Sequence, residues 1–74
     1  MKKLDRIMSE VFRMRVEELK DELTMKDVEN WDSLKHMDLI LSIEKGLDVR
    51  FSMDDILKMK DIKTIRKIVK EKSS

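Results

Sequence analysis

Several residue types that would restrict the fold are absent or rare in this sequence. It has no cysteine, which excludes a disulfide framework and a thiolate metal site. It has no proline and a single glycine, and it lacks the alternating runs of β-branched and aromatic residues that predict strands. No apolar run is long enough to cross a bilayer. These absences favour a small all-α protein, which we expect to be soluble and cytoplasmic.

The residues that are present recur at helical spacing. A chain of 74 residues forms one small domain, 1–74, with a thin core. The apolar pattern predicts four helices, over about 2–14, over 33–45, after Ser52 and after Asp61. Four apolar side chains can attach the long connection at 15–31 to the core: Val16, Leu19, Leu23 and Val28. We therefore predict a small bundle of three main helices and one short helix, with a long first loop.

The second predicted helix has a wide apolar arc. Leu34, Met37, Leu41 and Glu44 share one stripe. Ile40 and Ile43 widen this stripe, and Leu39 lies toward one flank. Gly46 falls where the residue after the helix is expected, and glycine adopts the left-handed conformation there at little cost. Leu47 would then fold back onto Leu41.

The stretch Trp31-Asp32-Ser33-Leu34 precedes this helix and lies near the middle of the chain. Ser33 is a good N-cap, because its side-chain oxygen can accept a backbone N–H two or three residues further on. Asp32 would then lie just outside the cap, beside the hydroxyl, and Leu34 would point toward the core. The unpaired N–H groups and partial positive charge of the helix start suit a phosphodiester. No serine–histidine–acid arrangement stands out, so Ser33 is not predicted to be a nucleophile.

The tripeptide Asp32-Ser33-Leu34, followed by this helix, resembles the modification site of the acyl and peptidyl carrier proteins. The resemblance covers nearly the whole chain and implies a four-helix bundle of the acyl-carrier type. It implies that Ser33 carries 4′-phosphopantetheine, that Asp32 and Leu34 flank the attachment point, and that a phosphopantetheinyl transferase adds the group from coenzyme A. Such a protein is not an enzyme. It carries acyl intermediates as thioesters for fatty-acid, polyketide or related specialised biosynthesis.

The resemblance also implies that partner enzymes dock on the second helix. The residues expected to meet them are Lys35, Met37, Asp38, Leu41 and Glu44. Asp38 and Glu44 fall where the family commonly has acidic residues, whereas Lys35 and Lys45 depart from that pattern. A dedicated ligase, synthase or transferase is therefore a fair alternative to the ordinary fatty-acid synthase enzymes. The implied partners are the phosphopantetheinyl transferase and the enzymes that load or use acyl groups. We expect a monomer without metal that binds neither nucleic acid nor membranes.

The charge distribution leaves other functions to consider. Residues 17–32 hold two basic and seven acidic side chains, whereas residues 56–74 hold seven basic and two acidic ones. The basic end would suit a small nucleic-acid binder, but no aromatic residue is interleaved with its lysines. Two further alternatives remain: an aminoacyl or peptidyl carrier of a non-ribosomal or surface-polysaccharide pathway, and a helical interaction module in which Ser33 is only a cap.

Two side chains near Ser33 and two methionines carry weaker expectations. Trp31 is expected to pack the loop against the bundle, with its N–H seeking a partner. His36 is expected to be a solvated surface side chain. Met37 and Met59 could line a pocket for acyl cargo that folds back between the helices, or they could simply fill the core.

Overall fold

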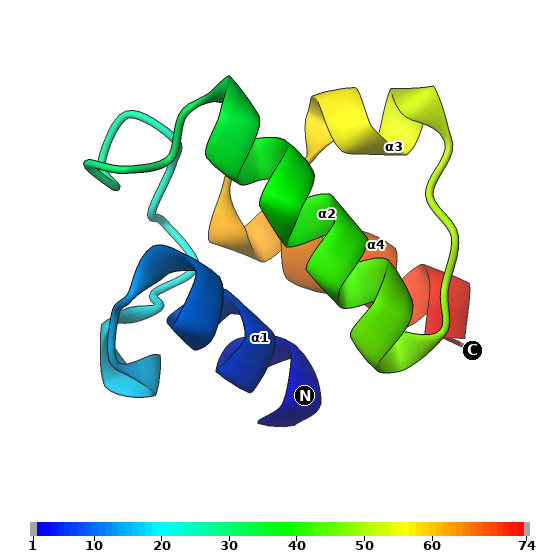
Figure 1. Cartoon of the computed structure of the whole chain (residues 1–74), viewed down its shortest axis with the longest axis horizontal. Helices are drawn as coiled ribbons and strands as arrows, with labels where there is room; N and C mark the ends of the chain where they lie inside the picture. The colour runs from blue at the N-terminus through cyan, green and yellow to red at the C-terminus, as the bar shows by residue number, and fades with distance from the viewer. Residues whose placement is uncertain (1, 74) are drawn as a thin grey trace.

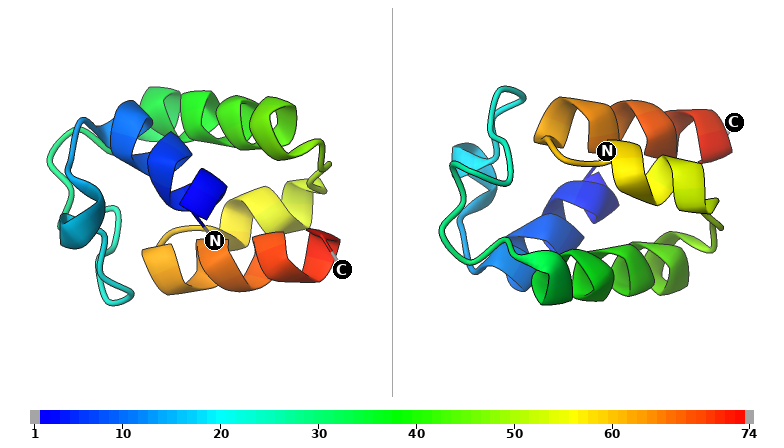
Figure 2. Two further views of the ribbon diagram at one scale, coloured as in Figure 1. Left: turned by 90° about the horizontal axis from the view of Figure 1, so that it is seen from below. Right: turned by 90° about the horizontal axis from the view of Figure 1, so that it is seen from above.

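The computed structural model describes residues 2–73 and confirms the all-α prediction (Figure 1). The α-helices in chain order are α1 (Lys2–Phe12), α2 (Ser33–Leu47), α3 (Met53–Lys58) and α4 (Ile62–Ser73). A single 3₁₀ turn, η1 (Val16–Glu18), lies in the long connection between α1 and α2. Seen from above and from below, α2 and α4 form opposite sides of the bundle, and α1 and α3 lie between them (Figure 2).

The core is one cluster of buried side chains to which α1, α2, α4 and the long connection all contribute. On α1, Leu4, Met8 and Phe12 are buried at four-residue intervals, which is the face that the apolar spacing predicts. On α4, the predicted face is also the buried one: Ile62, Ile65, Ile68 and Val69. Both helices have a single apolar stripe, so only one orientation removes their apolar surface from water.

α2 packs on one side of the predicted apolar arc, the side that carries Leu39, Ile40 and Ile43. Its buried residues are His36, Leu39, Ile40 and Ile43. The predicted stripe is exposed instead: Leu34 is 77% exposed, Leu41 52% and Met37 46%. α2 is apolar around much of its circumference, so periodicity alone allows more than one inward face. The face that packs against α1 carries Leu39, Ile40 and Ile43 together with His36.

The end of α2 also differs from the prediction. Gly46 lies inside the helix, which continues to Leu47, and Asp48 adopts the left-handed conformation with φ 55° and ψ 50°. A short polar side chain tolerates that conformation better than most residues do. Gly46 instead allows the side chain of Ile7 on α1 to lie close to the α2 backbone, because a Cβ at position 46 would lie 2.6 Å from Cδ1 of Ile7. Leu47 packs against the core, whereas Leu41 is exposed.

The long connection follows the bundle closely. α1 ends at Phe12, two residues before the predicted boundary, because Arg13 takes a left-handed conformation with φ 55°. Leu19, Val28 and Trp31 are buried, but Val16 is 44% exposed and does not attach the loop as expected. The connection also pairs with the chain before α4 through a single antiparallel bridge between Thr24 and Asp61.

Arg66 on α4 joins three parts of the chain. Its guanidinium donates to the carboxylates of Asp5 on α1 and Asp21 in the connection, and to the carbonyl oxygen of Leu19. Burial by itself would lower the pKa of Arg66, but the hydrogen bonds that it donates to Asp21 and Asp5 outweigh this effect and raise the pKa. Arg66 therefore stays charged and holds the connection against α1 and α4.

α3 has only six residues and begins with a reciprocal capping box. The Ser52 hydroxyl accepts the Asp55 N–H at 3.1 Å, and the Asp55 carboxylate accepts the Ser52 N–H at 3.0 Å. Lys72 on α4 lies 3.0 Å from the same carboxylate. The pKa of Asp55 is lowered mainly by the hydrogen bond from the Ser52 backbone N–H, and next by the hydrogen bond from the Lys72 ammonium.

We predict that Asp55→Asn makes the protein less stable at pH 7 and that its difference from the wild type disappears in acid. A carboxylate whose pKa is lower in the folded state stabilises the fold above its ordinary pKa. That contribution is lost as the pH falls through the folded-state pKa, below about pH 4. Urea unfolding of both proteins at pH 7 and pH 3 tests this. A difference that is the same at both pH values would contradict the prediction.

Candidate functional site

The first turn of α2 places Asp32 and Ser33 in different roles from those predicted. Asp32 is the N-cap: its backbone is extended, and its side chain accepts the Lys35 N–H at 2.8 Å. Ser33 is the first helical residue, not the cap. Aspartate and serine are about equally good caps, so the sequence alone did not distinguish the two positions. Because Asp32 performs the capping, the exposed Ser33 hydroxyl is not engaged by the helix start over the described residues.

Leu34 was predicted to point toward the core, but its side chain is 77% exposed. It lies on the outer face of α2 with Met37 and Leu41, which are also exposed. Asp38 is exposed on the same helix, and Lys35 is half-buried. Four of the five expected docking residues, Lys35, Met37, Asp38 and Leu41, are thus at least partly in solvent, and over residues 2–73 their side chains make no hydrogen bond. The fifth, Glu44, is half-buried, and its carboxylate accepts the Phe51 N–H at 2.9 Å, which holds the linker after α2.

His36 was predicted to be a solvated surface side chain, but it is buried, with only 8% of its surface exposed. The indole N–H of Trp31 donates to Nδ1 of His36 at 3.0 Å, and Nε2 of His36 lies 2.9 Å from the Ile56 carbonyl oxygen on α3. An indole N–H can only donate, so Nδ1 accepts, and Nε2 must carry the proton that it donates to Ile56. Trp31 is buried as expected, and its ring lies 4.7 Å from that of Phe12 on α1.

A groove of about 530 Å³ lies beside Ser33, between the end of the connection, α2 and α3. We call it the Ser33 groove. Its apolar lining is Met25, Met37, Met53, Ile56 and Leu57. Its polar lining is Ser33, His36, Lys26 and Lys60, with no carboxylate. Met37 thus lines an apolar groove, whereas Met59, which was considered with it, is fully buried in the core.

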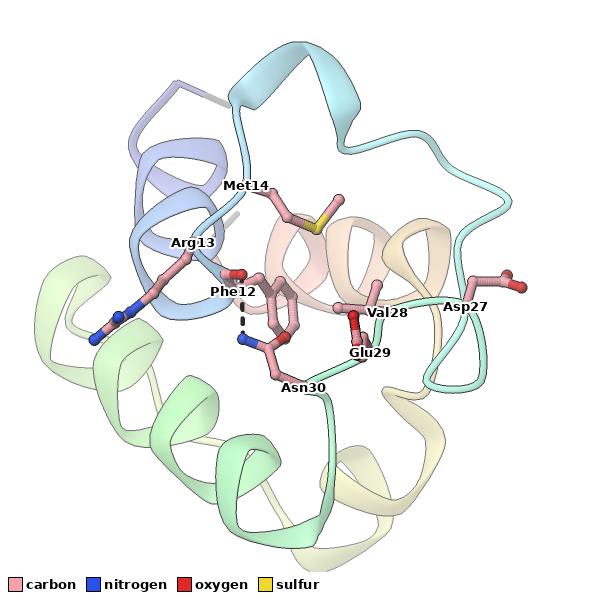
Figure 3. Close-up of a pocket in the computed structure, with 7 residues that line it drawn as sticks. All are labelled: Phe12, Arg13, Met14, Asp27, Val28, Glu29 and Asn30. Carbon is pink, nitrogen blue, oxygen red and sulfur yellow. Dashed lines mark hydrogen bonds between the residues drawn. The ribbon is translucent and has the colours of Figure 1, made fainter.

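A second pocket, of about 500 Å³, lies at the far end of α1 against the long connection (Figure 3). Asn30 donates to the Phe12 carbonyl oxygen at 3.3 Å on its wall. Arg13, Asp27 and Glu29 contribute charges of both signs there. None of the predicted site residues lines this pocket, so it is separate from the Ser33 groove.

Two other kinds of site can be considered. Residues 2–73 contain no group of three or more histidine, cysteine, aspartate or glutamate side chains that could hold a metal ion. Over the same residues, every helix is too short or too polar to span a bilayer.

Comparison with known proteins identifies the class of protein. The family described as phosphopantetheine attachment site matches residues 2–71, so the chain belongs to this family of carrier proteins. The solved structures similar to it include the solution NMR structure of the holo acyl carrier protein from Geobacter metallireducens. The two share 32% sequence identity at a TM-score of 0.83, over 97% of this chain and 86% of that one. No curated protein matches the chain.

The chain is therefore a carrier with a covalently attached 4′-phosphopantetheine, and its family carries groups rather than catalysing reactions. The residues at the start of α2 fit this group. Ser33 offers an exposed hydroxyl, and the N–H groups of Ser33 and Leu34 have no partner within the helix because the helix begins there. An apolar groove that includes Lys26 and Lys60 lies directly beside the hydroxyl.

The capping assignment predicts opposite outcomes for two neighbouring substitutions. Asp32→Ala removes the bond to the Lys35 N–H and should lower the free energy of unfolding by about 1 kcal/mol. Ser33→Ala removes an exposed hydroxyl and should change it by less than about 0.5 kcal/mol. Urea unfolding followed by the fluorescence of Trp31 measures both. A larger loss for Ser33→Ala than for Asp32→Ala would show that Ser33 is the cap after all.

Proposed function

We propose that the Ser33 hydroxyl is the attachment point and that the protein is an acyl carrier. The observation that carries this proposal is the first turn of α2, where Asp32 caps the helix and leaves the neighbouring hydroxyl exposed at the mouth of an apolar groove. When attached, the prosthetic group supplies a terminal thiol that holds an acyl group as a thioester.

The residues around Ser33 would each favour modification in a different way. Asp32 is fixed by its bond to the Lys35 N–H, which keeps a carboxylate next to the serine as a feature for the transferase to recognise. The positive end of the α2 dipole stabilises the negative charge of a phosphodiester on Ser33. Lys26 and Lys60 in the Ser33 groove add positive charge near that position.

The outer face of α2 is the surface on which we place the transferase and the acyl-loading and acyl-using enzymes. Leu34, Met37 and Leu41 expose an apolar stripe that starts beside Ser33, and Lys35 and Asp38 flank it. Exposed apolar stripes of this kind mark interaction surfaces. We leave Glu44 out of this surface, because its carboxylate is already bonded to the linker after α2.

The groove supports an acyl cargo over an aminoacyl one. Its lining is mainly apolar, and its charged members are two lysines without a carboxylate. The protonated amine of an aminoacyl group would meet two like charges there and no carboxylate to neutralise it, which is unfavourable. A carrier of fatty-acid, polyketide or related specialised biosynthesis is thus the reading we prefer, with the aminoacyl carrier as the alternative.

The attachment proposal is tested by intact mass after incubation with coenzyme A, Mg²⁺ and a promiscuous phosphopantetheinyl transferase. We expect the wild type to gain one phosphopantetheine and Ser33→Ala to gain none. Ser52→Ala is the matched control, because Ser52 is also an exposed serine at a helix start, and it should be modified like the wild type. Modification of Ser33→Ala, or none of well-folded wild type by several transferases, would overturn the proposal.

The docking face generates a separate prediction. Leu34→Asp and Leu41→Asp should each lower kcat/KM of the transferase at least about tenfold, equivalent to about 1.4 kcal/mol. Both side chains are exposed, so stability should change by less than about 0.5 kcal/mol. Val16→Asp is the control, because Val16 is an exposed apolar residue on η1, away from this face. Equal losses in all three variants would contradict a docking role for the α2 stripe.

A further inference from the structure

His36 joins the two helices that border the Ser33 groove. Its Nε2–H donates to the Ile56 carbonyl oxygen on α3 at 2.9 Å, and its Nδ1 accepts the Trp31 indole N–H at 3.0 Å. Both ring nitrogens are therefore bonded, and the ring is fixed between the connection, α2 and α3. The Trp31 and His36 rings are stacked at 29°, with centroids 6.0 Å apart, which further limits rotation of the imidazole.

The hydrogen bond from His36 to Ile56, which we call the His36 bridge, lies where the groove meets the core. His36 and Ile56 both line the groove. Ile40, one turn further along α2, and Met59, the residue after α3, have fully buried side chains, at 1% and 0% exposed. The hydrogen bond from His36 to Ile56 thus spans the boundary between the open groove and the packed interior. A ligand that passed between His36 and Ile56 from the groove toward Met59 would have to break this bond.

Breaking the bridge is unfavourable at both ends. A movement of His36 away from α3 leaves the Ile56 carbonyl without its imidazole donor, and rotation of the ring leaves the buried Trp31 N–H without an acceptor. Buried polar groups without partners are destabilising, and the core behind the bridge is already filled by tightly packed side chains.

We propose that His36 determines cargo specificity by keeping the acyl group in the Ser33 groove and out of the bundle core. This proposal rests on the proposed attachment at Ser33. The cargo class that it favours is an apolar acyl group short enough to lie along an open groove of about 530 Å³, against Met37 and Met53. His36 acts by positioning α3, not by contact with the thioester.

The methionines provide reporters on both sides of the bridge. Met37 and Met53 line the groove, and Met59 lies in the core behind it. The chain is labelled with [¹³C-methyl]methionine, and the transferase loads it either with coenzyme A or with octanoyl-coenzyme A. Comparison of the methyl NMR spectra of the two products shows which methionines the octanoyl group contacts. We expect the Met37 and Met53 signals to shift in the wild type and the Met59 signal to stay unchanged.

Two variants test whether His36 causes this distribution. In His36→Ala the bridge is absent, so octanoyl loading should shift the Met59 signal as well. In His36→Gln the side-chain amide can still donate to the Ile56 carbonyl, so the wild-type pattern should return. A Met59 shift in the wild type, no methionine shift at all, or identical patterns in all three proteins would overturn the proposal. Should His36→Ala not fold, His36→Leu replaces it, because leucine also cannot donate to the Ile56 carbonyl but fills more of the space, and it should likewise shift the Met59 signal.

The failure of this proposal can be told apart from failure at Ser33. Intact mass is measured on each sample before the spectra are recorded. Absence of the octanoyl-phosphopantetheine mass, or its presence in Ser33→Ala, would refute the attachment proposal. A correct mass on Ser33 together with a wild-type Met59 shift would refute only the role of His36.

Discussion

The hydrogen-bonded chain from Trp31 through His36 to Ile56 is the constraint on which the arrangement around Ser33 depends. It joins the long connection, α2 and α3, and the contact of Trp31 with Phe12 extends it to α1. α3 has six residues, none of them fully buried, and so short a helix is not stable alone. The position of α3 therefore depends on contacts with its neighbours. At the Ser33 groove, that contact is the hydrogen bond from His36 to the Ile56 carbonyl oxygen.

The first turn of α2 separates two requirements that one residue could not meet. A serine that caps a helix has its oxygen committed to a backbone N–H, whereas a serine that is modified must present that oxygen to another protein. Asp32 takes the capping role, so the Ser33 hydroxyl is exposed at the positive end of α2. The same geometry turns Leu34 outward and starts the apolar stripe that continues through Met37 and Leu41.

The sequence predicted the all-α class, the number of helices and the inward faces of α1 and α4, because each of those helices has one apolar stripe. It also predicts that the attachment site lies at the start of α2, and this stays a prediction. Within the wide apolar arc of α2, the expected residues Ile40 and Ile43 are buried, whereas the expected stripe of Leu34, Met37 and Leu41 is exposed. Periodicity does not show which side of so wide an arc packs against the neighbouring elements. The burial of His36 was not predicted either, because it depends on the hydrogen bond that Nδ1 accepts from the Trp31 indole N–H, which local sequence does not show. Gly46 was similarly misassigned, because its contact with Ile7 on α1 is not visible in local sequence.

The most direct test of the account is to locate the prosthetic group on the chain by fragmentation mass spectrometry. The protein would be co-expressed with a phosphopantetheinyl transferase, digested, and sequenced through the peptide that spans Trp31 to Lys35. We predict that the added mass lies on Ser33 and on no other serine. Placement on Ser42 or Ser52, or a fully unmodified chain that is correctly folded, would contradict the proposal that the first turn of α2 is built to present Ser33.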